Sequence, residues 1–250
     1  FKECIIIIRK LYIILYFIRS SISMNETIEE FSRIYKLDNV SEILVHTGKE
    51  LLVSKDQVII SPGEKLDGFY LVKEGRVIAK QYSPKGSVKI ICILEENSIF
   101  FESNALFGIP ACCFFKATEN SILIFVKTED LLDLLVKDLN VALFIMQSLT
   151  MKFYSNLNHA DELLFYDTNW RVCHFFLTLA ENFGVVEGNK IRINIKISQQ
   201  FISNLVGINR VTSVRIIQKL KNLNLIEQTN GYYYIKDLEG LKKHMDTSLN

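Results

Sequence analysis

Proline and glycine are scarce in this chain, with 3 and 11 of 250 residues. Their scarcity excludes low-complexity linkers rich in these residues. Charge of one sign is also lacking: the formal net charge is only +1, which excludes a strong overall attraction to polyanions or polycations. Because 49% of the residues are hydrophobic, the chain can bury the core of one large or two modest domains.

Cysteine and histidine are few and lack the spacings of metal sites. The five cysteines are odd in number and contain no CxxC pair, which argues against a disulfide framework and indicates reduced thiols. The four histidines show no metal-ligand spacing, so we predict no metal and no other cofactor. The sequence also has no phosphate-binding glycine loop, nucleophile elbow or HExxH motif. We therefore predict a cytoplasmic protein that is not an enzyme and has no catalytic residues.

The first 23 residues are apolar but lack an uninterrupted membrane span. Basic residues divide them into two short runs, Ile5–Ile8 and Leu11–Ile18, whereas a transmembrane helix needs about 20 apolar residues. No small-residue cleavage site follows the longer run. Met24 then opens an ordinary sequence, so we interpret residues 1–23 as a leader or an artefact of upstream translation or cloning. We expect no membrane association; a membrane anchor or a genuine helical arm is the alternative.

Short β-type runs separated by turns extend from Leu51 to Lys127. The turn signals are Pro62-Gly63, Gly68, Glu74-Gly75 and Pro84-Lys85-Gly86. Their spacing is typical of a small antiparallel roll or barrel. We expect a last strand from about Ser121, and a short amphipathic helix, Glu26–Tyr35, before the roll.

A helical pattern without proline or glycine occupies Glu129 to Tyr166. One mostly apolar stripe comprises Ala142, Ile145, Leu149, Phe153, Asn156, Ala160 and Leu163. Phe144, Met151 and Leu157 lie off that stripe, so the helix is apolar on two sides. One side can pack on the roll, and we expect the other to pack on the same helix of a second subunit. A central core helix in a monomer is the alternative.

A capped helix and a strand follow this long helix. Asp167 can cap a helix from Thr168 to Asn182 that ends at Gly184. The segment NKIRINIKI then alternates apolar and polar residues, which predicts a strand.

The last part of the chain contains two short helices and a hairpin. Ser198 begins the first helix, Gly207 interrupts it, and Asn209 begins the second helix, which runs to about Asn222. Asn230-Gly231 is a two-residue hairpin turn. Helix, glycine turn, helix and two-stranded wing together outline a winged helix-turn-helix.

Positive charge is concentrated in this region. Between Gly188 and Ile226 there is no Asp or Glu, and the basic residues are Lys190, Arg192, Lys196, Arg210, Arg215, Lys219 and Lys221. A DNA phosphate backbone would attract such a patch. A solvated basic face is the alternative.

The second short helix has two distinct faces. Its inward stripe comprises Ile216, Ile217 and Leu220. Its opposite face carries Arg210, Val211, Val214, Arg215 and Gln218. Arginine can bind guanine through two hydrogen bonds and valine can contact a thymine methyl group, so we predict that this face enters the major groove.

Three segments resemble the Crp/Fnr family of transcription regulators. They are PGE with YLVKEGRV, TNWRVCHFFLTLA, and ISQQFISNLVGINRVTSVRIIQKLKNLNLI, the most specific. The resemblance covers Met24 to the C-terminus. It implies an α+β fold, with a cyclic-nucleotide-binding-type β-roll (double-stranded β-helix or jelly roll) at 24–134, a dimerisation helix at 135–166 and a C-terminal winged helix-turn-helix at 167–250.

The resemblance also implies the partners. A homodimer would bind a palindromic operator whose half-sites lie about one DNA turn apart, with RNA polymerase as a protein partner and activation as the commoner outcome in the family. The residues expected to contact DNA are Ser198, Gln199, Gln200, Asn209, Arg210, Val211, Thr212, Val214 and Arg215.

The second short helix departs from the family pattern in two ways. Many members carry glutamate where this chain has Val211, and that glutamate accepts a hydrogen bond from cytosine. Valine cannot, so we predict an A·T-richer half-site, as for the halorespiration regulators of the family. The usual apolar-then-small pair after Thr212 is reversed, as Ser213-Val214, which leaves the role of Val214 open.

The effector-binding segment also departs from its cyclic-nucleotide-binding relatives. Glu102 is retained where they hold ribose, but Phe101 replaces a glycine and Ala111-Cys112 replaces the Arg-Ser pair that holds the cyclic phosphate. We therefore predict a small apolar or aromatic effector other than cyclic AMP, in a pocket rimmed by Phe100, Phe101, Phe107, Phe114 and Phe115. The residues expected to bind it are Phe101, Glu102, Ser103, Asn104, Cys112, Cys113, Asn156 and Leu157.

Other interpretations of the sensor stay open. The phenylalanines can fill the pocket themselves, Cys112 and Cys113 can sense oxidation as thiols, and His159 is the best-placed candidate for a haem ligand. Adjacent cysteines on a strand point to opposite faces, and buried cysteine commonly serves only in packing. A module that senses a small molecule or a cyclic nucleotide without binding DNA is a further alternative. In a regulator, we expect the effector to move the winged helices about a hinge near Asp167.

Overall fold

The computed structural model describes residues 38–84 and 86–247, and it divides the chain into two compact units. The first unit comprises the described parts of Phe1–Gln81 together with Ile91–Asn156, and the second comprises Tyr82–Ile90 with Leu157–Asn250. The predicted leader at 1–23 and the predicted helix Glu26–Tyr35 lie outside the described residues.

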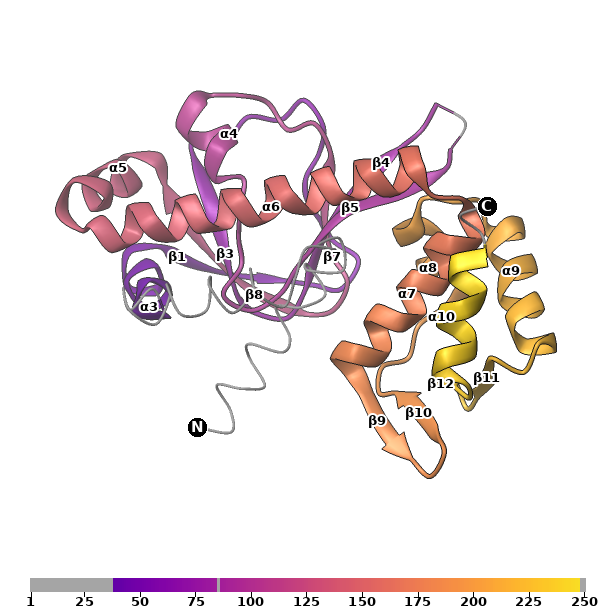
Figure 1. The fold of residues 1–250 in the computed structure, drawn as a ribbon. Helices are drawn as coiled ribbons and strands as arrows, with labels where there is room; N and C mark the ends of the chain where they lie inside the picture. The colour runs from indigo at the N-terminus through magenta and orange to yellow at the C-terminus, as the bar shows by residue number, and fades with distance from the viewer. Residues whose placement is uncertain (1–37, 85, 248–250) are drawn as a thin grey trace. The chain divides into compact units, whose positions relative to one another are not determined.

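The first unit is built on two four-stranded antiparallel sheets (Figure 1). Its strands are β1 (Lys49–Val53), β2 (Val58–Ile60), β3 (Gly68–Glu74), β4 (Val77–Tyr82), β5 (Val88–Leu94), β6 (Ile99–Phe100), β7 (Phe114–Ala117) and β8 (Ser121–Lys127). The strand orders are β1-β8-β3-β6 and β2-β7-β4-β5. The helices α3 (Asp38–Thr47), α4 (Glu102–Phe107) and α5 (Thr128–Lys137) complete it. The predicted β-roll is thereby confirmed.

The turn between β3 and β4 requires glycine. Gly75 has φ +89°, and a Cβ atom there would lie 2.4 Å from Ser121 Oγ and 2.8 Å from the Asn120 carbonyl oxygen. The same hydroxyl accepts a hydrogen bond from the Arg76 amide at 3.1 Å. The Ser121 side chain and the Asn120 backbone therefore leave no space for a Cβ atom at Gly75.

Gly75→Ala should destabilise the protein by more than the backbone strain alone, which is about 1–2 kcal/mol. Gly207→Ala is the matched control, because Gly207 also has a positive φ, of +72°, but its nearest neighbour to an added Cβ lies 3.7 Å away. Urea unfolding followed by circular dichroism measures both. An equal loss in the two variants would show that the Ser121 contact is unimportant.

The predicted helix from Glu129 to Tyr166 is two helices, α5 and α6 (Leu139–Phe165), bent by 117°. Asp138 separates them because it adopts an extended conformation, and its Oδ1 accepts a hydrogen bond from the Asn140 amide at 2.8 Å. The predicted start of the dimerisation helix at 135 is therefore wrong, since that residue lies in α5. Among the described residues no single helix meets the length and hydropathy of a membrane span, although α5 and α6 taken together do.

The predicted stripe on α6 is only partly correct. Ile145 is buried and Leu149 packs on the core of the roll, but Phe153 and Leu163 are exposed. The buried positions of α6 are Val141, Ile145, Ser155, His159 and Glu162. Apolar periodicity could not locate this face because its later positions are polar.

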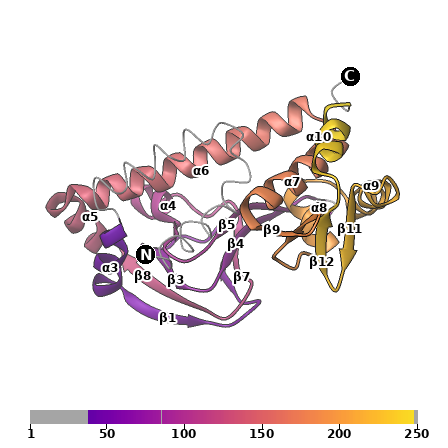
Figure 2. The same ribbon diagram turned by 60° about the horizontal axis from the view of Figure 1, so that its bottom comes forward.

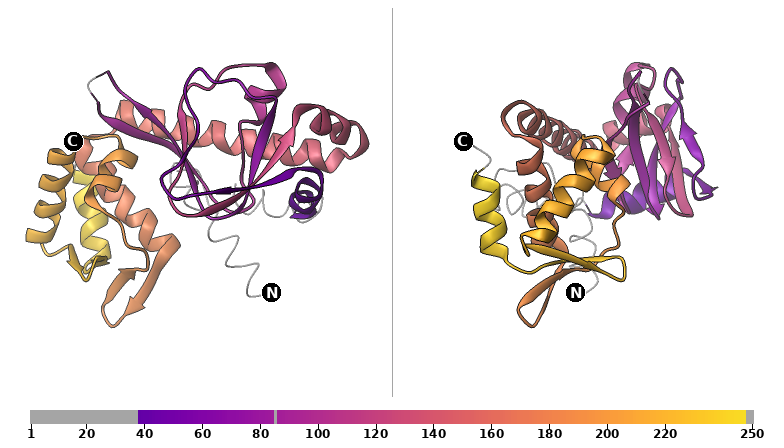
Figure 3. Two further views of the ribbon diagram at one scale, coloured as in Figure 1. Left: turned by 180° about the vertical axis from the view of Figure 1, so that it is seen from behind. Right: turned by 90° about the vertical axis from the view of Figure 1, so that its right-hand side faces the viewer.

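The second unit contains the predicted winged helix-turn-helix (Figures 1 and 2). Its elements after α6 are α7 (Thr168–Phe183), β9 (Gly184–Glu187), β10 (Lys190–Ile193), α8 (Gln199–Val206), α9 (Arg210–Asn222), β11 (Ile226–Thr229), β12 (Tyr232–Ile235) and α10 (Leu238–Asp246). The four strands form one sheet in the order β11-β12-β10-β9. Sequence reasoning missed β9 and α10, and it extended β10 too far. Figure 3 shows the β9–β10 hairpin projecting from the helices.

Candidate nucleic-acid interface and effector cassette

Side-chain caps set the positions of α8 and α9. Ser198 Oγ accepts a hydrogen bond from the Phe201 amide at 3.1 Å, and Asn209 Oδ1 accepts one from the Thr212 amide at 2.8 Å. Gly207 ends α8 in the left-handed conformation, which glycine adopts without strain. The predicted helix starts at Ser198 and Asn209 and the turn at Gly207 are confirmed.

The two faces of α9 lie as predicted. Ile216, Ile217 and Leu220 are buried, and so is Ser213. The exposed positions include Arg210, Val211, Val214, Arg215 and Gln218. Ser213 takes the inward position of the reversed pair and its hydroxyl has no hydrogen-bond partner within the described chain, while Val214 lies on the outer face.

The remaining predicted contact residues surround this face. Ser198, Gln200 and Asn209 are exposed, and Gln199 and Thr212 are half-buried. Gln200 Nε2 donates to Asn204 Oδ1 at 2.8 Å and to Ser203 Oγ at 3.2 Å. The helix-turn-helix thus places all nine predicted residues at or next to the start of α8 and along α9.

The basic patch is weaker than its seven cations indicated. Lys190 forms an ion pair with Glu227 at 2.7 Å, and Arg192 with Glu187 at 2.6 Å. The hydrogen bond from Lys190 lowers the pKa of Glu227 below its usual value. Both acids lie just outside the acid-free segment, and strand pairing brings them back to it.

The other cations of the patch have no ion-pair partner among the described residues. Lys196 lies over the Tyr232 ring at 5.2 Å, and Lys221 Nζ donates to Gln228 Oε1 at 3.0 Å. Arg210, Arg215 and Lys219 are exposed on α9. Positive charge that is free to bind phosphate is therefore concentrated on α9 and beside it.

Phe101 opens the effector cassette, which we define as residues 100–113. It is buried and immediately precedes α4 with φ +71°, a left-handed conformation that costs a phenylalanine about 1–2 kcal/mol. Glycine would adopt this conformation without strain, whereas Phe101 carries the strain and places a ring in the core of the roll.

Glu102 is paired within its own unit. The residue is 1% exposed, and its Oε1 forms an ion pair with Lys152 Nζ of α6, while Ser148 Oγ donates to the same oxygen at 3.3 Å. Lys152 Nζ also donates to the Ile99 carbonyl at 2.9 Å. The cassette is thus tied to α6 by a residue that sequence reasoning missed. The available signal was the spacing of Lys152 from Ile145: seven positions are about two helical turns, which places the lysine on the buried face of α6.

The other predicted effector residues do not converge on Glu102. Asn104 Nδ2 donates to the carbonyls of Ile109 and Pro110, at 3.2 and 3.1 Å, and so holds the loop after α4. Ser103 is half-buried, whereas Asn156 and Leu157 are exposed on α6. Leu157 lies on another face of α6 than Lys152, whereas Asn156 follows Lys152 by one turn and donates its Nδ2 to the Lys152 carbonyl at 2.8 Å.

The phenylalanines pack mainly against one another. Phe100 stacks on Tyr70 and on Phe115, each at 5.1 Å between ring centroids, and Phe101 meets Phe115 edge-on at 6.3 Å. Phe107 instead is 75% exposed. The predicted pocket rim is therefore wrong for Phe100, which lies in the closed core of the roll.

The adjacent cysteines precede β7 in a bend rather than on a strand. Cys112 is exposed and Cys113 is buried. Burial, with a smaller contribution from Cys112 and Cys92, raises the pKa of Cys113 to about 12, and burial raises that of Cys92 to about 11. Thiols with such pKa values are poor nucleophiles at neutral pH, which favours a packing role for Cys113 and Cys92.

Buried polar groups join the end of α6 to α7 and α8 within the second unit. Glu162 Oε1 lies 2.9 Å from His174 Nδ1, and Trp170 stacks between Tyr166 and His174. Arg171 Nη1 donates to the Val206 carbonyl at 3.0 Å. The boundary between the units falls between Asn156 and Leu157, inside α6, and the hinge expected near Asp167 stays a prediction.

The division into units splits β5, and Lys89, near its start, belongs to the second unit. Its partial burial should cost folding free energy in a pH-dependent way. Burial, followed by the charge of Arg171, lowers the pKa of Lys89 to about 8 from an ordinary 10.5, although Glu162 opposes the shift. The folded state therefore binds fewer protons than the unfolded state between these values, and stability rises with pH across that window. Below pH 8, Lys89 is charged in the folded state as well as in the unfolded state, so the full free-energy cost of burying its charge is present.

Lys89→Met should accordingly stabilise the protein at pH 7, with the advantage over wild type disappearing as the pH approaches 10.5. Urea unfolding followed through Trp170 fluorescence measures this difference in the unit that contains both residues. The same advantage at pH 7 and pH 10 would show that Lys89 is not the titrating group.

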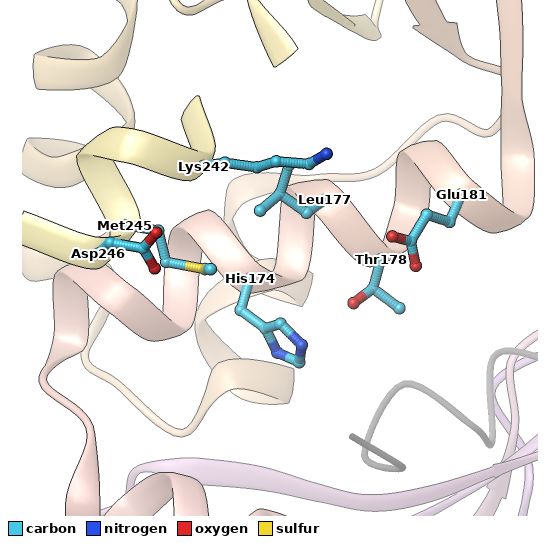
Figure 4. Close-up of a pocket in the computed structure, with 7 residues that line it drawn as sticks. All are labelled: His174, Leu177, Thr178, Glu181, Lys242, Met245 and Asp246. Carbon is cyan, nitrogen blue, oxygen red and sulfur yellow. The ribbon is translucent and has the colours of Figure 1, made fainter. Parts of the chain in front are cut away.

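A pocket of about 260 Å³ lies between α7 and α10 (Figure 4). Its lining residues are His174, Leu177, Thr178, Glu181, Lys242, Met245 and Asp246. Figure 4 shows their polar ends pointing in different directions, so we assign the pocket no ligand. No group of three or more His, Cys, Asp or Glu side chains suited to a metal ion occurs within the described residues.

Two family models match this chain. The model described as a cyclic nucleotide-binding domain matches residues 50–138, and the one described as a Crp-like helix-turn-helix domain matches residues 171–244. They coincide with the β-roll and with the winged helix-turn-helix.

Curated relatives match along most of their length. The global nitrogen regulator of Synechocystis sp. is 26% identical over 177 residues, which cover 70% of this chain and 79% of that protein. A CRP-like cAMP-activated global transcriptional regulator of Mycobacterium tuberculosis is 21% identical over 189 residues, which cover 76% of this chain and 84% of that protein.

Solved structures share the fold. CprK complexed with OCPA aligns with a TM-score of 0.69 at 21% identity, covering 84% of this chain and 93% of that chain. A CooA mutant from Carboxydothermus hydrogenoformans aligns with a TM-score of 0.70 at 20% identity, covering 81% of this chain and 89% of that chain.

Proposed function

We propose, on the premise that this chain belongs to the Crp/Fnr family of transcription regulators, that it binds an AT-rich palindromic operator as a homodimer. The observation that carries the proposal is the exposed face of α9, the second helix of the helix-turn-helix. Arg210, Val211, Val214 and Arg215 lie on this face, directly after the Asn209 cap. RNA polymerase is the proposed protein partner. We expect the protein in the cytoplasm, together with its DNA.

The dimer would form along α6. Leu139, Met146, Phe153 and Leu157 are exposed apolar residues of this helix, and Phe153 is 60% exposed. They belong to a series with alternating steps of four and three: Leu139, Leu143, Met146, Thr150, Phe153, Leu157, Ala160 and Leu164. This is the a/d spacing of a coiled coil, which two copies of α6 would bury between them.

Sequence preference would come from Val211. A valine cannot accept the hydrogen bond of the cytosine amino group, so G·C at the contacted base pair gains nothing from it. Arg210 and Arg215 remain able to bind guanine elsewhere in the half-site. The expected operator is consequently AT-rich but not composed of A·T pairs alone.

Selection of bound sequences from a random duplex pool tests this proposal. Wild type should enrich two inverted AT-rich half-sites about one DNA turn apart. Val211→Glu should shift one position of each half-site toward G·C, with about 1–3 kcal/mol of discrimination. An unchanged preference in the variant would contradict the role of Val211.

The effector is proposed to be a small apolar or aromatic molecule rather than cyclic AMP. The cassette offers no arginine for a cyclic phosphate, and Glu102 is already paired with Lys152. One structural neighbour is CprK with bound OCPA, and another is described as c-di-GMP responsive, so this fold accommodates more than one class of ligand. Because Phe100, Phe101 and Phe115 already pack together, an effector would have to displace part of this cluster.

Native mass spectrometry of freshly purified protein tests both the dimer and the effector. A dimer carrying a co-purified organic molecule is the expected result. Tight binding of added cyclic AMP, or a monomer at micromolar concentration, would contradict the corresponding part of the proposal.

A further inference from the structure

Two valines stand out on the exposed face of α9. The helix exposes seven residues, and five of them are Arg210, Arg215, Gln218, Lys219 and Asn222. The other two are Val211, 79% exposed, and Val214, 37% exposed. A β-branched residue lowers helix propensity and gains little burial at such positions, so folding alone does not explain the pair.

The two valines form one apolar ridge. They are three positions apart, which makes them neighbours on a helix surface. Arg210 and Arg215 flank them in the sequence, and within the described chain neither arginine forms an ion pair. An apolar strip between two cations matches a groove that has anionic walls and apolar groups on its floor.

The DNA major groove has this chemistry. Its walls are phosphates, and the apolar group that base edges present there is the C5-methyl group of thymine. A protein partner is less suited to the ridge. A protein surface that neutralised both arginines would need acidic side chains on either side of an apolar contact only two residues long.

We propose that Val211 and Val214 act together as a methyl-contact ridge, which recognises the C5-methyl groups of neighbouring pyrimidines. This inference rests on the proposed DNA-binding function and goes beyond it. Because valine makes no hydrogen bonds, the ridge does not distinguish the O4 atom of thymine from the amino group of 5-methylcytosine. The preference for A·T pairs is then a preference for methyl groups, and C5 methylation of cytosine at the contacted positions strengthens binding.

Base analogues test the inference directly. The dissociation constant of the full chain is measured by fluorescence anisotropy on the selected operator and on the same duplex with deoxyuridine in place of thymine. Each contacted methyl group lost should weaken binding about fourfold, the effect of one buried methylene-sized group. In duplexes with cytosine at these positions, 5-methylcytosine should bind about fourfold more tightly than cytosine.

Val211→Ser and Val214→Ser should each reduce the preference for thymine over uracil, measured as the ratio of the two dissociation constants, at the bases that each residue contacts. Val186→Ser is the control: it alters an exposed valine of β9 and should keep the wild-type preference for thymine over uracil. All three positions are exposed, so the variants should fold. Equal affinity for thymine and uracil duplexes, with sequence-specific binding intact, overturns the ridge and leaves the proposed function standing. Loss of preference for the operator over a scrambled duplex in wild type overturns the proposed function itself.

Discussion

Replacing Lys152 with alanine should lower the free energy of unfolding of the first unit by about 3–5 kcal/mol. Glu102 is buried, and Lys152 supplies the countercharge for its carboxylate. Without Lys152, the carboxylate would lose its countercharge and keep the hydrogen bond from Ser148, and the Ile99 carbonyl would lose the hydrogen bond that Lys152 donates. Urea unfolding at neutral pH, followed by circular dichroism, measures the loss.

Two control variants separate this effect from the loss of any surface lysine. Lys137 forms an ion pair with Asp133 at 3.5 Å, but both side chains are mostly exposed, so Lys137→Ala should change stability by less than about 0.5 kcal/mol. The double variant Glu102→Gln with Lys152→Met removes both charges and should recover most of the loss. A Lys152→Ala variant as stable as Lys137→Ala would contradict the account of the cassette.

Charging the exposed face of α6 should produce a monomer. With Phe153→Glu and Leu157→Glu combined, like charges would meet across the proposed coiled-coil interface in place of apolar side chains. The loss of two-site binding should weaken operator affinity about 10²- to 10⁴-fold. Analytical ultracentrifugation measures the assembly, and fluorescence anisotropy measures the affinity.

Tyr154→Glu is the matched control for this double variant. Tyr154 is also an exposed aromatic residue of α6, but it lies off the proposed interface. It should remain a dimer with operator affinity close to that of wild type. Monomers in both variants, or in neither, would show that the interface is not the one proposed.

The helix-turn-helix could be predicted because its signals are local. Ser198 and Asn209 are side-chain caps, Gly207 supplies a left-handed turn, and Asn230-Gly231 forms the hairpin turn with positive φ at both residues. Each feature depends on a few neighbouring residues, which is the range over which single-sequence reasoning works.

The missed elements lack such signals. β9 begins at Gly184, directly after α7, and its four residues are all exposed, so it has no alternation of buried and exposed residues to detect. In α10, Gly240 interrupts the helical pattern, although Asp237 caps the helix through the Gly240 amide at 2.8 Å. The break at Asp138 was equally hidden, since the sequence there contains neither proline nor glycine.

The electrostatic details depended on tertiary contacts. Strand pairing brings Glu187 and Glu227 to Arg192 and Lys190, and the fold of the roll brings Glu102 to Lys152 across 50 residues of sequence. Counting charges along the chain could not reveal these pairs. It overstated the basic patch and missed the partner of Glu102.

Salt-dependent binding tests the central claim most directly. The full chain is titrated by fluorescence anisotropy with the selected operator and with a scrambled duplex, from 50 to about 200 mM salt. The account predicts that the affinity for both duplexes falls steeply as salt rises, because phosphate contacts release counterions, and that the operator stays the tighter ligand throughout. Affinity that is insensitive to salt, or equal for the two duplexes, would contradict sequence-specific DNA binding.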